Sequence, residues 1–166
     1  VHPSIQPAID ELISSLQDNR RCLVHGDFSP KNLLVTEDAV VLIDCEVGHY
    51  GDPTFDLGFF LSHLVLKGIA TGMGIDVMEL IEKFLAAYFE LVAKRLLGDE
   101  RCACELRLHR NLAACLLARV DGKSPVHYLD EKQQHHVRRY ALACLKHEPV
   151  PLALLTTHLH YQLTGI

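Results

Sequence analysis

Three oxygen-bearing side chains early in the chain have the types and the order that phosphoryl transfer requires. Asp27 and Asn32 lie in one loop between two short apolar segments, and Asp44 follows the next apolar segment. A hairpin formed by the second and third segments would bring Asn32 and Asp44 together at one end. Mg²⁺ prefers oxygen ligands of this kind, with phosphate and water completing its shell. Asp27 is then placed to accept the proton of an attacking hydroxyl and to orient it.

The elements expected around these residues are three short strands. Apolar, β-like segments occur at 22–24, 33–35 and 40–43, and the polar turn at 36–38 between the last two is typical of a hairpin. The segment 44–54 is rich in Gly, Asp and Pro, which predicts a loop. The chemistry is therefore expected on a small β-rich platform.

Apolar residues at helical spacing predict one helix before the strands and several after them. The predicted helices are 3–17, 55–69, 76–97 with Asp76 as N-cap and Gly98 as C-cap, 100–120, 130–146 and a short one after Pro151. The expected fold class is α+β, mostly α, with helices that support the platform.

Several motifs together resemble the aminoglycoside phosphotransferase and choline kinase superfamily. The tripeptide His-Gly-Asp at 25–27, followed by Asn32, resembles its catalytic loop. The segment 43–46 (Ile-Asp-Cys-Glu) resembles its metal-binding segment, and 52–58 (Asp-Pro-Thr-Phe-Asp-Leu-Gly) resembles its start-of-helix signature. Residues 117–125 are also similar to a segment seen in many members.

The resemblance implies a protein kinase-like C-terminal lobe, made of a catalytic-loop β-hairpin and a helical bundle. Residues 1–166 would form a single domain, with the catalytic and metal-binding loops at 22–58 and a helical, substrate-binding subdomain at 59–166. Residues 1–23 contain no G-x-G-x-x-G loop, so the N-lobe of a kinase is expected to be absent from this chain.

The resemblance also implies a role for each residue of the site. Asp27 would be the catalytic base or hydroxyl-orienting group, and Asn32 and Asp44 would bind Mg²⁺ and, through it, the nucleotide. His25 would be a structural support. Asp56 would brace the catalytic loop from beneath, and plain N-capping of the following helix is an equally good interpretation; both can hold.

The neighbours of these residues have looser expectations. Ser29 and Lys31 are expected to contact phosphate. Cys45 departs from the aromatic residue often found at that place in the superfamily. Glu46 is interpreted either as a weak supporting group near the metal or as a solvated carboxylate, and Asp52 as a turn residue.

The function that follows is ATP-dependent phosphotransfer to a hydroxyl of a small molecule, with Mg²⁺ as cofactor and ATP as co-substrate. The expected partners are that substrate, the nucleotide and an N-terminal lobe in cis or in trans, without which the chain is expected to be inactive. A non-catalytic, pseudokinase-like binding module is the alternative. A metal-dependent hydrolase using His25, Asp27 and Asp44 would need more ligands than the loop supplies.

Composition sets the remaining limits. A net charge of −5 argues against a nucleic-acid or anionic-membrane partner. The apolar run 57–66 is interrupted by Ser62 and His63 and is too short to span a bilayer. Six cysteines without a preceding signal peptide favour reduced thiols in a cytoplasmic protein over a disulfide framework.

Overall fold

The computed structural model describes residues 2–96 and 99–147, which are mostly helical and carry two small antiparallel sheets. In chain order the elements are the 3₁₀ turn Pro3–Ile5, α1 (Gln6–Asp18), β1 (Cys22–Val24), the 3₁₀ turn Pro30–Asn32, β2 (Leu33–Val35), β3 (Val40–Leu42), β4 (His49–Gly51), α2 (Pro53–Thr71), α3 (Gly74–Val92), α4 (Asp99–Asp121) and α5 (Glu131–Lys146). This arrangement agrees with the expected α+β, mostly α class.

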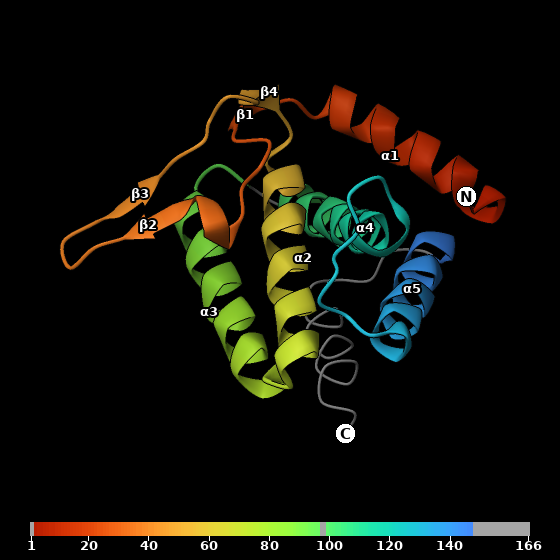
Figure 1. Ribbon diagram of the computed structural model, residues 1–166. Helices are drawn as coiled ribbons and strands as arrows, with labels where there is room; N and C mark the ends of the chain where they lie inside the picture. The colour runs from red at the N-terminus through yellow and green to blue at the C-terminus, as the bar shows by residue number, and fades with distance from the viewer. Residues whose placement is uncertain (1, 97–98, 148–166) are drawn as a thin grey trace.

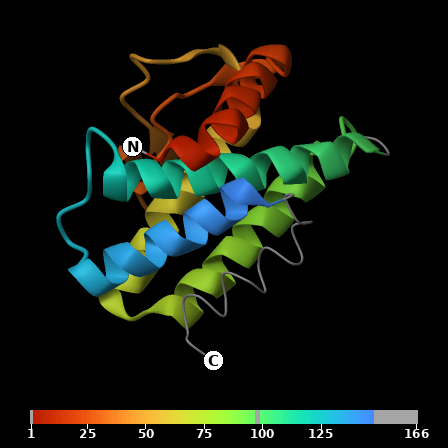
Figure 2. The same cartoon turned by 90° about the vertical axis from the view of Figure 1, so that its right-hand side faces the viewer.

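Helix α2 is the centre of the helical part. It packs against α3 and α4, α5 packs against α4, and α1 lies across α4 (Figures 1 and 2). Leu61 and Leu66 of α2, Ile81 of α3, and Leu108 and Leu112 of α4 are fully buried. Each such side chain contributes about 1.5–3 kcal/mol to folding, so this contact fixes the helices on which the loops rest. In the described residues no helix is long and apolar enough to cross a membrane.

The two sheets are both two-stranded. β2 and β3 form the expected hairpin, with Leu33 opposite Leu42, and it projects away from the helices (Figure 1). β1 pairs with β4, with Val24 opposite His49. β4 lies inside 44–54, where the sequence predicts only loop. The prediction of loop alone is therefore wrong. The local sequence does not reveal this strand, because its three residues show no apolar alternation and its pairing with β1 is a long-range contact.

Helix α3 differs from its prediction at both ends. It begins at Gly74 and ends at Val92, and its N-cap is Met73, which makes no side-chain capping bond. Asp76 is therefore not the N-cap. Its carboxylate lies in the first turn, where it interacts favourably with the positive end of the helix dipole. The expected C-cap, Gly98, lies outside the described residues.

Helix α5 begins where the sequence predicts. The Asp130 side chain accepts from the backbone N–H of Gln133 (2.7 Å), and the Gln133 side chain accepts from the backbone N–H of Asp130 (3.0 Å). This capping box satisfies two N–H groups that the helix leaves without partners. The short helix expected after Pro151 lies outside the described residues.

All six cysteines are free thiols, as the sequence predicts. Burial raises the pKa of Cys104 to about 11 and that of Cys115 to about 12, so both thiols are protonated at neutral pH. Cys45 and Cys102 are exposed.

Candidate active site

The loop after β1 turns at Gly26, which has a φ of +81°. A side chain there would be strained by this left-handed backbone and would place its Cβ 2.8 Å from the carbonyl oxygen of Val47. Glycine at this position therefore lets the chain bring Asp27 out of β1 at a sharp angle.

Asp56, in the first turn of α2, holds this turn in place. Its Oδ2 accepts from the backbone N–H of His25 (2.6 Å), and its Oδ1 accepts from the backbone N–H of Gly26 (2.9 Å). The N-cap of α2 is Asp52, whose side chain accepts from the backbone N–H of Thr54 (3.0 Å). The plain N-capping interpretation thus applies to Asp52, whereas the Asp56 carboxylate has the geometry of a loop brace.

His25 connects the loop to the end of β3. Its Nε2 lies 2.9 Å from the carbonyl oxygen of Ile43, and its Nδ1 lies 3.2 Å from the backbone N–H of Asp27. The first contact requires a proton on Nε2 and the second requires a lone pair on Nδ1, so both are satisfied by one neutral tautomer. The ring is buried, which fits a supporting role.

The side chain of Asp27 faces two donors from its own loop. Lys31 Nζ lies 2.8 Å from its Oδ2, and Asn32 Nδ2 lies 3.1 Å from the same atom. Burial by itself would raise the pKa of Asp27, but the hydrogen bonds from Lys31 and Asn32, with the charge of Lys31, hold that pKa below its ordinary value. The carboxylate is therefore ionised at neutral pH.

Asn32 and Asp44 lie at the same end of the β2–β3 hairpin. The backbone N–H of Ile43 donates to the carbonyl oxygen of Asn32 (3.0 Å), which continues the ladder by one residue and leaves Asp44 just beyond it. Asp44 is exposed and has a φ of +64°. Among the described residues it is the only one other than glycine with a positive φ, a conformation that Asp adopts more readily than most residues.

The donor set at this hairpin end fits a magnesium ion. The Asn32 amide points its NH₂ at two acceptors, the main-chain oxygen and Oδ2 of Asp27, so its Oδ1 is free to bind a cation. With the Asp44 carboxylate, this gives two oxygen ligands. No group of three or more His, Cys, Asp or Glu side chains in residues 2–96 and 99–147 could hold a metal. A magnesium ion here would need phosphate and water oxygens as well.

The apolar side of the loop is fixed to the helices by stacked rings. The ring centroid of Phe28 lies 4.7 Å from that of Phe60 on α2. The Phe60 centroid lies 4.9 Å from that of Phe84 on α3. Aromatic pairs at such distances add about 0.5–1.5 kcal/mol beyond the area they bury. These ring contacts therefore anchor Phe28, the residue next to Asp27.

The two residues expected to contact phosphate lie in different surroundings. Lys31 is exposed, and its ammonium group is held by Asp27. Ser29 is fully buried, and its hydroxyl has no hydrogen-bond partner in the part of the chain that the structure describes. The structure thus places Lys31, but not Ser29, where solvent and a phosphate can reach it. Glu46 is exposed, like Cys45 before it.

Comparison with known proteins shows the family of this chain. Residues 3–103, more than half of the chain, match the phosphotransferase enzyme family (APH). The chain belongs to this family. It is 38% identical over 58 residues to methylthioribose kinase 1 of Oryza sativa subsp. japonica and 38% identical over 55 residues to methylthioribose kinase of Enterobacter sp. (strain 638). These segments cover 35% and 32% of this chain and 14% of each relative's own length.

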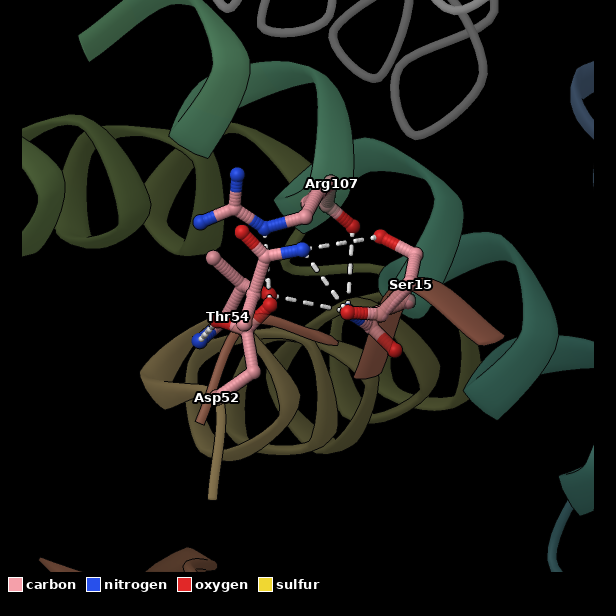
Figure 3. Close-up of polar contacts among 6 residues, drawn as sticks. Ser15, Asp52, Thr54 and Arg107 are labelled. Atoms are coloured by element: carbon pink, nitrogen blue, oxygen red, sulfur yellow. Dashed lines mark hydrogen bonds and ion pairs between the residues drawn. The ribbon is translucent and has the colours of Figure 1, made fainter. Parts of the chain in front are cut away.

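In this member of the phosphotransferase enzyme family, a buried ion pair fixes the start of α2 to α4. Arg107 Nε lies 2.7 Å from Asp52 Oδ2, and Asn111 Nδ2 donates to the Thr54 hydroxyl (3.0 Å) beside it (Figure 3). The Asp52 side chain is 0% exposed and that of Arg107 is 15% exposed. Breaking such a pair costs about 3–5 kcal/mol. Because Asp56 lies one turn further along α2, this pair also fixes the brace of the catalytic loop.

Two polar residues on helices near Asp27 were not expected from the sequence. His63 of α2 and Arg119 of α4 each have a buried nitrogen without a hydrogen-bond partner among the described residues. The signals that point to them are modest: His63 interrupts the apolar run 57–66, and Arg119 lies in the family-like segment 117–125.

Proposed function

We propose that this chain carries the catalytic residues of an ATP-dependent kinase that phosphorylates a hydroxyl group of a small molecule. Membership of the phosphotransferase enzyme family and the similarity to methylthioribose kinases support small-molecule kinase activity. The observation that carries the proposal is the arrangement of one ionised carboxylate, Asp27, next to the hairpin end that carries Asn32 and Asp44.

Asp27 would act by orienting the acceptor hydroxyl. Lys31 and Asn32 keep its carboxylate ionised, so it can accept a hydrogen bond from the hydroxyl. They also lower its pKa, which makes it a weak base. Phosphoryl transfer through a loose transition state needs positioning of the nucleophile more than early removal of its proton. The low pKa of Asp27 is therefore compatible with the proposed step.

Asn32 Oδ1 and the Asp44 carboxylate would hold Mg²⁺ against the nucleotide phosphates. The ion would supply positive charge to the phosphate oxygens. On the protein side, the requirement is that both oxygens stay free of internal partners. The Asn32 amide turns its NH₂ toward Asp27, which leaves its Oδ1 without a hydrogen bond among the described residues. The Asp44 carboxylate is exposed to solvent.

We further propose that residues 1–166 form one domain equivalent to a kinase C-terminal lobe, with loops at 22–58 and a substrate-binding subdomain at 59–166. An N-terminal lobe, in cis or in trans, would cover the nucleotide, and the chain alone would be inactive. Exposed apolar side chains on and beside the strands support this: Leu23, Leu34, Val35, Val40, Val41, Leu42, Ile43, Val47 and Tyr50. Exposed apolar side chains in such number on and beside the strands are compatible with a covering partner. A cytoplasmic location remains a prediction.

The test uses the full-length protein that carries this chain. Calorimetry should detect Mg²⁺-dependent ATP binding that is lost in Asp44→Ala, and a panel of sugars, amino alcohols and methylthioribose should include a compound that accepts phosphate. Asp27→Ala should lower that rate by about 10²–10⁴-fold. Asp38→Ala, an exposed acid in the hairpin turn, is the matched control and should change neither result. No nucleotide binding at all would instead favour a non-catalytic binding module.

A further inference from the structure

Two buried side-chain nitrogens, one on α2 and one on α4, have no hydrogen-bond partner among the described residues. His63 Nε2 and Arg119 Nε are enclosed by protein, yet neither makes a hydrogen bond within residues 2–96 and 99–147. Burying polar nitrogens without partners is unfavourable because they lose the hydrogen bonds they would make with water. A buried polar group of this kind requires an explanation, and a bound water, ion or ligand that completes it is one.

His63 belongs to a surface formed by α2 and by the segment that follows α4. His63 and Lys67 are four residues apart on α2 and therefore lie on the same face of that helix. Lys67 Nζ lies 4.8 Å from the centre of the Tyr128 ring. This surface is buried at His63 Nε2 and exposed at Lys67 and Tyr128, so it opens toward solvent.

Arg119 joins this surface from α4, the helix that packs against α2. Its carbonyl oxygen accepts from the backbone N–H of Val126 (2.8 Å), which folds the segment carrying Tyr128 back beside the end of α4. The charge of Arg119 acts on both the Tyr128 hydroxyl and the His63 ring. These interactions indicate that Arg119, His63, Lys67 and Tyr128 lie close to one another.

Most of the charged groups that act on the His63 ring are positive. Burial lowers the pKa of His63, and the positive charge of Arg119 lowers it further, with smaller contributions from Lys31 and Lys67. The negative charge of Asp27 acts in the opposite direction, but Asp27 is already paired with Lys31. His63 is therefore neutral at pH 7, and neither Arg119 nor Lys67 forms an ion pair with an acid within residues 2–96 and 99–147.

We propose that His63, Lys67 and Arg119 form a subsite that binds an anionic group, a carboxylate or a phosphate, of the acceptor whose hydroxyl meets Asp27. The proposal rests on the proposed function and adds the substrate class, a hydroxy acid or a phosphorylated sugar or alcohol. Arg119 would bind the anion through its guanidinium, whose geometry matches carboxylate and phosphate oxygens, and His63 would donate from its ring.

The first test measures binding without requiring catalysis. The full-length protein, with its histidines ¹³C-labelled and the His63 signal assigned by His63→Gln, is titrated with gluconate, with inorganic phosphate and with sorbitol, the neutral counterpart of gluconate. The anions should shift the His63 signal and raise its pKa, since an anion stabilises the imidazolium. Sorbitol should not. Equal shifts with sorbitol and gluconate, or no shift with either anion, would overturn the subsite.

Arg119→Gln identifies the residue responsible. It should weaken gluconate binding about tenfold or more, the size expected for a lost hydrogen bond to a charged group. Lys83→Gln, which removes an exposed lysine on α3, is the control and should leave gluconate binding unchanged. Arg119→Gln should also keep or raise the thermal midpoint, because it removes a partly buried cation without a partner. A lower midpoint would indicate structural support instead.

A second set of measurements separates the acceptor from the nucleotide as the source of the anion. Gluconate should still shift the His63 signal when a non-hydrolysable ATP analogue and Mg²⁺ are saturating. Competition between them would show that Arg119 binds nucleotide phosphate and would overturn the proposal. Gluconate binding without phosphotransfer to any acceptor would refute the proposed function and keep the subsite. Transfer to sorbitol and gluconate with equal kcat/KM would refute the subsite and keep the function.

Discussion

The loop that carries Asp27 and the hairpin that ends at Asp44 are neighbours in the chain, but the rest of the molecule holds them very differently. The loop is fixed by Asp56 from α2 and by the Phe28 ring on Phe60. The β2–β3 hairpin projects away from the helices, and its residues from 34 to 44 are all exposed. The part of the candidate site that carries Asp27 is therefore held by contacts with the helices, whereas the part that carries Asp44 is exposed to solvent.

This difference shows how positioning is divided in the site. Asp27, which we propose to orient the acceptor hydroxyl, lies in a loop held by partly buried hydrogen bonds to Asp56 of α2. We propose that the helices also bind the acceptor. Asp44, which we propose to bind the metal, is attached mainly through the backbone ladder to Asn32 and the contact between His25 and Ile43. The hairpin is therefore the part whose position a nucleotide or a further lobe can still adjust.

The largest expected effect is a contrast between two aspartates. Asp56→Ala leaves the backbone N–H groups of His25 and Gly26 without an acceptor, so it should lower the free energy of unfolding by about 3 kcal/mol. Asp44→Ala should lower that free energy by no more than about 1 kcal/mol, the strain of alanine in the left-handed backbone, and should remove Mg²⁺-dependent nucleotide binding. Urea unfolding monitored by circular dichroism measures both variants. Equal destabilisation by the two would show that the loop and the hairpin are held alike.

A smaller contrast compares two glycines with positive φ. Gly72→Ala, at φ +70° with nothing within 4 Å of the added Cβ, should cost only the left-handed backbone strain, about 1 kcal/mol. Gly26→Ala, at φ +81°, adds a contact of 2.8 Å with the Val47 oxygen and should cost about 2 kcal/mol or more. Phosphotransfer should fall only in Gly26→Ala. The same unfolding measurement applies, and equal costs would mean that the loop moves freely to accept a side chain.

The smallest effect concerns pH. Activity should require ionised Asp27 and be lost as pH falls through its pKa, which lies below the ordinary value. Lys31→Met removes the strongest influence that lowers this pKa, so the acid limb of kcat/KM should move to higher pH. Because the pair is partly exposed, its contribution to stability, present above the unfolded-state pKa and lost on acidification, should stay below about 1 kcal/mol. Lys83→Met should leave the limb in place, and an unmoved limb in Lys31→Met would contradict this account.

The sequence predicted the hairpin and the loop geometry well because their determinants are local. Strands 22–24 and 33–35 occur as predicted, since each is a short apolar run bounded by polar turns. The proximity of Asn32 and Asp44 follows from hairpin register alone, and the bond between Ile43 and Asn32 agrees with it. The roles of these residues remain predictions.

Features that depend on distant contacts were missed. β4 exists because its backbone pairs with β1, and neither the composition nor the alternation of His49–Gly51 indicates a strand. The buried pairing of Asp52 with Arg107 joins residues that no motif relates. His63 and Arg119 are brought near Asp27 only by the packing of α2 against α4, which periodicity cannot predict residue by residue.

The free thiols give the molecule its own labelling sites. Cys45 is exposed and directly follows Asp44, whereas Cys104 is buried, Cys115 is partly buried, and both stay protonated at neutral pH. Thiolates, not thiols, react with maleimides and similar reagents. An environment-sensitive dye on Cys45, in a variant with Cys102 changed to Ser, would thus report events at the end of the hairpin without any engineered cysteine.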